Sequence, residues 1–163
     1  MKKVLQIFTL VCLSLTLTHC SDDDNSGDSP TEAQLTVSVN GVQFEATAIV
    51  AALGNDNKYF ELDSANGNTS EGLQLRIGDF SEASAPVLEA GMTYNYTGAN
   101  DTDIFYQNSQ SVFGGTNGCQ ITIASIDLDN NTISGTFSGV VSDGADDQTL
   151  ANGQFNNIPF TVN

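Results

Sequence analysis

The chain has 163 residues, of which 20 are acidic and only four are Lys or Arg, so its formal net charge at pH 7 is −16. A charge of this size and sign repels nucleic acids and anionic lipid headgroups, and we therefore exclude a nucleic-acid-binding role. The sequence contains a single histidine, His19, and no tryptophan.

The first element predicted along the chain is an export signal. Lys2 and Lys3 precede an apolar run over residues 4–17, and this order is typical of a secretory signal peptide. The run is shorter than the roughly 20 residues that a membrane-spanning helix needs. We expect residues 1–19 to be a signal peptide that is removed.

The run ends at Leu17-Thr18-His19-Cys20, which resembles a bacterial lipobox. The resemblance implies that the chain is cut before Cys20 and that a lipid on the Cys20 thiol attaches it to a membrane. His19 departs from the pattern, which has a small residue there. A reactive Cys-His pair is the alternative, but it needs a folded environment that lowers the thiol pKa, and we prefer lipidation.

Cleavage before Cys20 would remove the only histidine. Lys58 and Arg76 would then stand against all 20 acidic residues, giving a net charge of −18. Ser-His-Asp and Cys-His catalysis and histidine-based zinc sites would be impossible. We therefore expect a protein that is not an enzyme and has no cofactor. A glycoside hydrolase that uses two carboxylates is the alternative that this argument leaves open.

Residues 20–32 predict an acidic, disordered tether, because they contain no large apolar residue after Cys20. The stretch is similar to the acidic segment that follows the lipidated cysteine in surface lipoproteins of Bacteroidota. This resemblance implies a lipid-anchored protein of the outer membrane that faces the cell surface.

From residue 33 to residue 163 apolar side chains recur with period two, which predicts one all-β domain. Asn40-Gly41 is typical of a type I′ hairpin turn. Residues 42–50 follow as one alternating segment, with Val42, Phe44, Ala46, Ala48 and Val50 in one row. Further strands are predicted at 59–63, 73–77, 92–97, 104–107, 119–128, 133–141, 149–150 and 154–162.

Two irregularities are predicted in the second half of the chain. Cys119, Ile121 and Ile123 share one parity, and Ile126 and Leu128 share the other, which indicates a bulge near residues 124–125 or a strand buried on both sides. Pro159 favours an edge position or a strand break. With roughly nine or ten short strands and no long helical pattern, we expect a single antiparallel β-sandwich or a partly open β-barrel.

Three segments together resemble a known family. They are VSVNGVQFEATA at 37–48, EAGMTYNYTG at 89–98, and TISGTFSGVVSDG with LANGQFNNIPF within 132–160. These segments are similar to small Bacteroidota lipoproteins that are classed only as domains of unknown function. The resemblance implies an all-β fold and a location, and it implies no catalytic residues.

Acidic loops are candidate calcium sites. Asp127, Asp129 and Asn131 offer oxygen ligands at alternating positions, as calcium loops do. The loop lacks the glycine and the glutamate that an EF-hand has at its sixth and twelfth positions, where Thr132 and Ser138 stand. Since Asp and Asn also favour turns, we prefer a turn without a metal here and in the loops at 101–103 and 143–147.

The aromatic region from Tyr94 to Phe113 is a candidate ligand site. If Tyr94, Tyr96 and Tyr106 face solvent, they can stack on a sugar, whereas sheet aromatics usually pack in the core, which we prefer. The leading hypothesis is a lipid-anchored, non-catalytic envelope protein that acts as a binding or structural module. A glycan- or solute-binding accessory protein is the alternative, and the partner is an unidentified envelope protein or glycan. Cys119 is expected to be a buried thiol.

Overall fold

The computed structural model describes residues 32–54, 56–78, 87–97 and 102–163. The predicted signal peptide, the lipidation site Cys20 and residues 20–31 of the tether lie outside these ranges. The described residues contain strands and no helix. The strands are β1 (Gln34–Val39), β2 (Val42–Glu45), β3 (Ala48–Gly54), β4 (Tyr59–Asn66), β5 (Glu71–Ile77), β6 (Thr93–Asn95), β7 (Thr102–Gln107), β8 (Val112–Gly115), β9 (Gln120–Asp127), β10 (Thr132–Ser142), β11 (Asp147–Pro159) and β12 (Thr161–Val162).

These strands form one open, mixed sheet. Its order is β12-β3-β4-β5-β7-β8-β10-β11-β1-β2, while β9 pairs with β10 and β6. Every pairing is antiparallel except that of β12 with β3, which is parallel. The predicted all-β fold, a sandwich or an open barrel, is confirmed, with twelve described strands instead of nine or ten.

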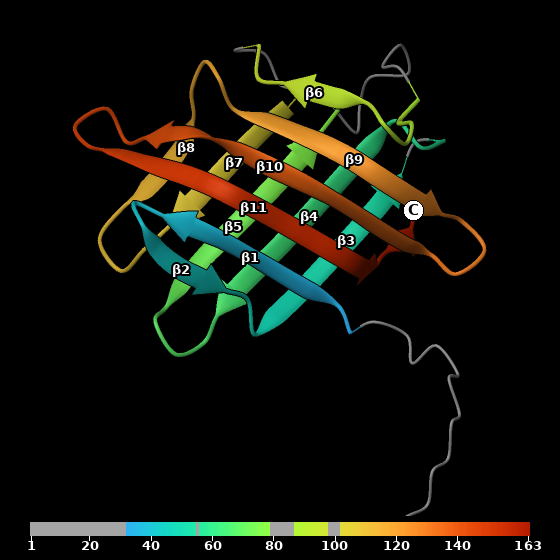
Figure 1. Cartoon of the computed structure of the whole chain (residues 1–163), viewed down its shortest axis with the longest axis horizontal. Helices are drawn as coiled ribbons and strands as arrows, with labels where there is room; N and C mark the ends of the chain where they lie inside the picture. Colours follow the sequence, from blue (N-terminus) through green and yellow to red (C-terminus); the bar gives the residue numbers. More distant parts are fainter. Residues whose placement is uncertain (1–31, 55, 79–86, 98–101) are drawn as a thin grey trace, which may run out of the picture. The chain divides into compact units, whose positions relative to one another are not determined.

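The two halves of the sheet lie in two layers. Figure 1 shows β3, β4, β5 and β7 as a back layer that crosses behind β1, β9, β10 and β11. The short strand β8 joins the layers, because Phe113 pairs with Tyr106 of β7 and Gly115 pairs with Val141 of β10. The sheet can therefore fold over on itself without losing its continuity.

The core fills the space between the layers with the inward rows of the strands. The rings of Phe60 on β4 and Phe155 on β11 stack across it with centroids 5.9 Å apart. Fully burying one such side chain stabilises the fold by about 1.5–3 kcal/mol. The largest fully buried side chains are Phe44, Phe60, Phe155, Leu35, Leu53, Leu62, Leu75, Ile77, Ile104, Ile121, Ile123 and Ile133.

Two phenylalanines and two glycines pair reciprocally on β10 and β11. Gly135 lies opposite Phe155, and Phe137 lies opposite Gly153. A Cβ on Gly135 would lie 2.3 Å from Phe155 Cζ, and one on Gly153 would lie 2.7 Å from Phe137 Cδ2. Each ring thus occupies the space that a side chain on the opposite strand would need. This packing is the physical reason for a Gly-x-Phe sequence in both strands.

Three local predictions are confirmed. Asn40 and Gly41 have φ angles of 49° and 85°, as a type I′ turn requires. Ser125 pairs with Ser134 and Ile123 with Gly135, so Ala124 is the bulged residue. β11 ends at Pro159, where a strand break was expected.

The single row expected over residues 42–50 is wrong. β2 ends at Glu45 and β3 begins at Ala48, because the chain passes from one layer to the other at this point. Val42 and Val50 are 72% and 70% exposed, while Phe44 is buried. Alternation restarts when a chain changes layers, and a pattern drawn through the crossing assigns the wrong face.

Two more differences concern strand length. β8 has a single inward side chain, Phe113, followed by two glycines, which leaves little periodic signal. The strands expected at 149–150 and 154–162 are largely one strand, β11. Asn152 and Asn157 adopt left-handed φ angles of 55° and 48°, which lets the strand continue through irregular positions. None of the described segments is a helix long and apolar enough to cross a membrane.

Candidate functional site

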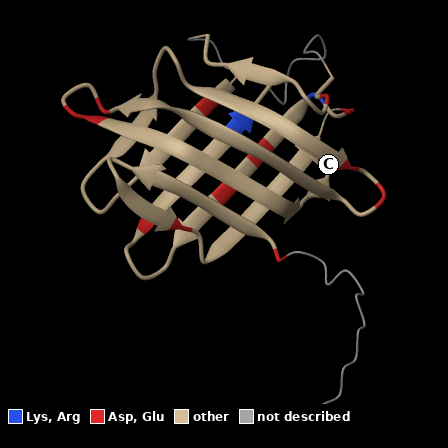
Figure 2. Ribbon diagram, viewed as in Figure 1, with Lys and Arg blue, Asp and Glu red and all other residues tan. Residues whose placement is uncertain are grey.

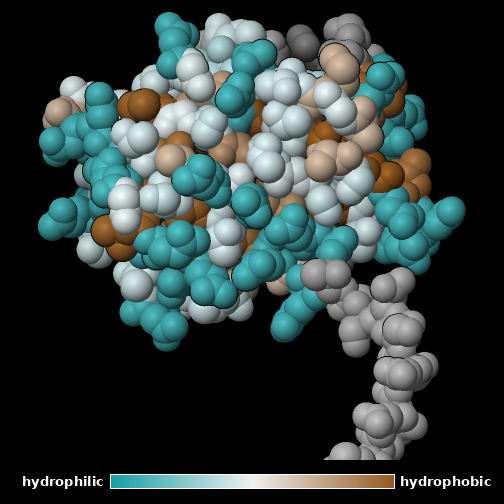
Figure 3. Space-filling model, in the orientation of Figure 1, coloured by the Kyte–Doolittle hydropathy of each residue, from teal (hydrophilic) through white to brown (hydrophobic). Residues whose placement is uncertain are grey.

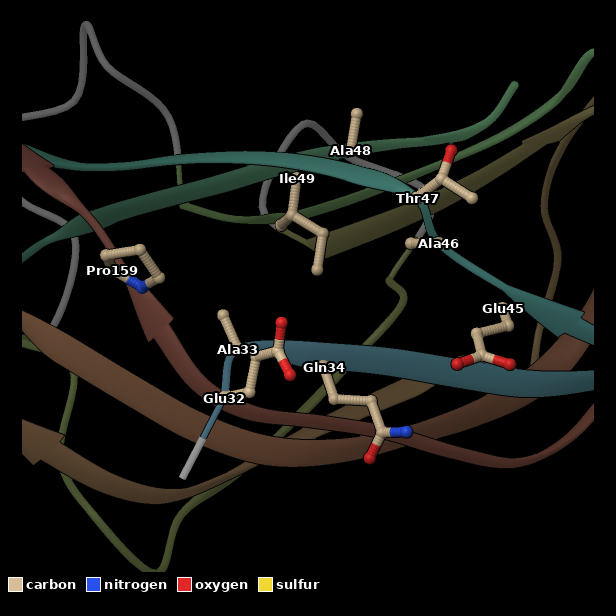
Figure 4. Close-up of a pocket in the computed structure, with 9 residues that line it drawn as sticks. All are labelled: Glu32, Ala33, Gln34, Glu45, Ala46, Thr47, Ala48, Ile49 and Pro159. Atoms are coloured by element: carbon tan, nitrogen blue, oxygen red, sulfur yellow. The ribbon is translucent and has the colours of Figure 1, made fainter. Parts of the chain in front are cut away.

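Of three hollows on the described part of the chain, the one with the greatest volume is a groove beside the start of β1. Figure 4 shows it between the start of β1, the connection from β2 to β3, and Pro159. Its volume is about 590 Å³, and it is lined by Glu32, Ala33, Gln34, Glu45, Ala46, Thr47, Ala48, Ile49 and Pro159. The lining includes no aromatic ring, and the two carboxylates lie at separate places along the groove (Figure 4).

A second hollow lies on the outer face of the front layer. It has a volume of about 320 Å³ and is lined mainly by uncharged polar side chains of β9, β10 and β11, such as Gln120, Thr136 and Gln154. Its one aromatic residue, Phe137, is only 3% exposed. Figure 3 shows this side of the molecule as a largely hydrophilic surface with apolar residues in separate small groups.

The third hollow lies on the outer face of the back layer and has a richer set of side chains. It has a volume of about 300 Å³ and is lined by Asp63, Ser64, Gly72, Leu73, Gln74, Phe105, Gln107 and Val112. Asp63, Gln74 and Phe105 are paired across β4, β5 and β7, so they form one outward row. In the next row Gly72 has no side chain, which leaves the hollow open. We call these residues the outer-face hollow.

Hydrogen bonds fix the polar side of the outer-face hollow. Gln74 Nε2 donates to Glu61 Oε1 at 2.9 Å and to Asp63 Oδ1 at 2.8 Å. The Tyr59 hydroxyl donates to the other oxygen of Glu61. Burial, helped by this bond to Glu61, raises the pKa of Tyr59 above its usual range. The amide of Gln74 is therefore held in one orientation between two carboxylates.

Phe105 lines the hollow on its other side, and Arg76 lies behind it as a neighbour of the ring. The Arg76 guanidinium lies 5.8 Å from the centroid of the Phe105 ring and 3.8 Å from Asp103 Oδ2. Asp103 Oδ1 accepts the backbone N–H groups of Ile104 and Gly115 at 2.8 Å and 3.1 Å. These contacts hold Phe105, which is half-buried, at the edge of the hollow.

The three candidate ligand-binding tyrosines lie elsewhere, packed against the core as we preferred. Tyr106 is 3% exposed, its ring packs against Phe113 with centroids 6.0 Å apart, and its hydroxyl donates to Glu71. Tyr94 and Tyr96 are half-buried and pack against the core. None of the three lines the outer-face hollow. Phe105, from the same aromatic region, does, because its position in β7 has the outward parity.

The acidic loop at the end of β9 is closed by its own side chain. Asp127 Oδ1 accepts the backbone N–H groups of Asp129 and Asn130, both at 3.0 Å, and Oδ2 accepts Asn130 Nδ2 at 2.7 Å. The bonds from Asn130 lower the pKa of Asp127 below its usual range. Asp129 and Asn131 are exposed in this turn.

The loop after β10 is built in the same way. Asp143 Oδ1 accepts the N–H groups of Ala145 and Asp146 at 2.9 Å and 2.8 Å, and these bonds lower its pKa. Among the described residues, no three His, Cys, Asp or Glu side chains are grouped as a metal site would need. In both loops the aspartate acts as a turn-forming residue.

The remaining sulfur candidate is Cys119. It is fully buried, and its Sγ lies 3.1 Å from the carbonyl oxygen of Val140, to which the thiol donates. Burial raises the pKa of the thiol, so the thiolate is disfavoured. In this environment the residue behaves as a small apolar side chain.

Comparison with known proteins identifies the family. A family model described as a domain of unknown function, DUF6252, matches residues 31–159, which is most of the chain. The chain therefore belongs to this family. No curated protein matches it, and no solved structure matches it either.

Proposed function

We propose that this member of the DUF6252 family is a lipid-anchored, non-catalytic protein of a bacterial envelope, with a β-domain that acts as a binding or structural module. The observation that carries the proposal is the order of segments before the domain. A short apolar run leads to Leu17-Thr18-His19-Cys20, and an acidic stretch follows it. In this proposal Cys20 carries the lipid and the domain faces away from the membrane, on the outer surface of a Bacteroidota cell.

The non-catalytic part of the proposal rests on the chemistry of the site. The outer-face hollow is lined by one carboxylate, Asp63, which accepts a hydrogen bond from Gln74. A glycoside hydrolase needs two carboxyl groups about 5–9.5 Å apart across a cleft, one of which is protonated near neutral pH. Glu61 is the next carboxylate, but it accepts hydrogen bonds from both Tyr59 and Gln74. Both of its oxygens are thus engaged by neighbouring side chains, and Glu61 does not line the hollow.

The anchor is tested by expressing the full chain in a bacterial host supplied with an alkyne-labelled fatty acid. The wild type is expected to carry the label and to enter the detergent phase on Triton X-114 partition. Cys20→Ala should lose both properties. Cys12→Ser, a thiol change inside the apolar run, is the matched control and should keep them. Mass spectrometry that finds an uncleaved, unmodified N terminus on the wild type would overturn the proposal.

Surface exposure is tested separately on intact cells. Protease added outside the cells is expected to degrade the β-domain, because the proposal places it on the outer face of the outer membrane. A periplasmic protein of the same host is the control and should stay intact. Degradation that requires lysis of the cells would contradict the surface location and would leave the lipid anchor unaffected.

A further inference from the structure

We infer that the outer-face hollow binds a neutral saccharide, with Phe105 as the packing surface and Asp63, Gln74 and Gln107 as its hydrogen-bonding groups. The inference deepens the proposed function, since it names a ligand class for a binding module. It places the ligand away from Tyr94, Tyr96 and Tyr106.

The shape of the hollow suits one sugar ring. Its volume of about 300 Å³ is at the small end of the range for ligand pockets, about 300–1,000 Å³. The floor is the backbone around Gly72, so a flat ligand can approach the sheet. The hollow opens to solvent on an outer sheet face, which allows a sugar inside a longer chain to bind.

Hydrogen-bonding capacity is concentrated on the polar wall. The two N–H groups of Gln74 are used by Glu61 and Asp63, so its carbonyl oxygen is held in a fixed direction. A carboxylate accepts hydrogen bonds, and an amide side chain such as Gln107 both donates and accepts. A sugar hydroxyl also both donates and accepts, and a hydroxyl that donates to Asp63 makes a charge-assisted bond.

The Phe105 ring supplies the apolar contact. The face of an aromatic ring is electrostatically negative, and the C–H bonds on one face of a pyranose point positive hydrogens toward it. The Arg76 guanidinium lies over the ring at 5.8 Å from its centroid and helps to hold it in place. A ring fixed in this way loses little entropy when a ligand binds.

Charge selects against acidic ligands. The formal net charge of the chain is −16, and Figure 2 shows acidic residues along strands of the back layer and at the turns. Lys58 and Arg76 are the basic residues of the described part, and Arg76 is paired with Asp103. Uronic acids, sulfated sugars and phosphates would meet Asp63 without a free cation. A neutral saccharide fits the observed charges.

The experiment uses the full lipidated chain in detergent micelles. It is applied to an array of neutral oligosaccharides, namely glucans, mannans, galactans, xylans and N-acetylglucosamine oligomers, with acidic glycans and cationic peptides on the same array. At least one neutral class should bind. Hits are then measured by calorimetry with wild type and three variants.

Phe105→Ala is expected to weaken binding about tenfold or more, as for the loss of a central aromatic contact. Gln107→Ala changes an exposed side chain at the hollow and should weaken binding about threefold to tenfold, the loss of one or more hydrogen bonds. Val42→Ala, on an exposed position of β2, a strand that contributes no residue to the hollow, is the matched control and should leave affinity within about twofold. Thermal unfolding of each variant checks that it is folded. If Phe105→Ala does not fold, the affinity of Gln107→Ala tests the saccharide site instead.

Three results would overturn the inference. They are the absence of any neutral hit at millimolar concentration, binding confined to acidic glycans or cationic peptides, and hits that Phe105→Ala and Gln107→Ala leave unchanged. Fatty-acid labelling of the same samples is measured independently. A negative result for saccharide binding therefore leaves the lipid-anchor proposal unaffected. New reducing ends released from a hit would instead contradict the non-catalytic proposal.

Discussion

Substituting Gly135 by alanine probes the reciprocal pairing of Gly135 with Phe155 and Phe137 with Gly153. The added Cβ would lie 2.3 Å from Phe155 Cζ and 2.3 Å from the carbonyl oxygen of Thr122 on β9. Both distances are much shorter than van der Waals contact, and the Thr122 oxygen is a backbone atom of a strand that is paired in the sheet. Because neither neighbour can move without disturbing the sheet, we expect a loss near the top of the overpacking range, about 3 kcal/mol.

Urea unfolding followed by circular dichroism measures this loss as a lower midpoint at an unchanged slope. Gly114→Ala is the matched control, since its Cβ would meet nothing nearer than 3.5 Å, and we expect a change within about 0.5 kcal/mol. A Gly135→Ala protein as stable as the Gly114→Ala protein would refute the packing argument.

A double-mutant cycle separates the two contacts of the new Cβ. Phe155→Ala removes a fully buried ring and should by itself destabilise the protein by about 3–5 kcal/mol. In that background Gly135→Ala should become less harmful, because only the contact with the Thr122 oxygen remains. Strict additivity would show that the ring does not oppose the Cβ.

Two further predictions concern pH. At the acid end, the pKa values of Asp127 and Asp143 are lower in the folded protein than in the unfolded chain. As the pH falls, these two carboxylates therefore take up protons in the unfolded chain first. Their contribution to stability is present above pH about 4 and is lost as the pH falls through their pKa values in the folded protein. The double variant Asp127→Ala/Asp143→Ala should therefore show a flatter fall in melting temperature between pH 5 and pH 2, and an unchanged slope would contradict this origin. At the alkaline end, burial and the bonds to carboxylates raise the pKa values of Tyr59 and Tyr106, so the stability due to their protonated forms is present below pH about 10 and is lost above it. Phenolate absorbance of these two residues should appear only as the protein unfolds. The Tyr106→Phe variant should be less stable by about 1 kcal/mol at pH 7, because the hydrogen bond to Glu71 is missing. Ionisation of Tyr106 at an ordinary pH in the folded protein would argue against that bond.

Local features of the fold followed from the sequence because they depend on neighbours along the chain. The Asn40-Gly41 turn needs two residues with positive φ, and the sequence supplies residue types that tolerate it. The parity change between Ile123 and Ile126 requires an extra residue between them, and Ala124 is the bulge. The inward rows of β5 and β10 followed from period two alone.

Arrangements between distant segments were decided by the tertiary structure. The chain changes layers after Glu45, and this crossing, which no local pattern marks, exposes Val50. The candidate site is of the same kind. Asp63, Gln74 and Phe105 come from three strands and meet because of their pairing across the back layer. The sequence alone determined that Phe105 and Tyr106 face opposite sides of a strand, and only the packing of the two layers determined that Tyr106 lies in the core and Phe105 on the surface.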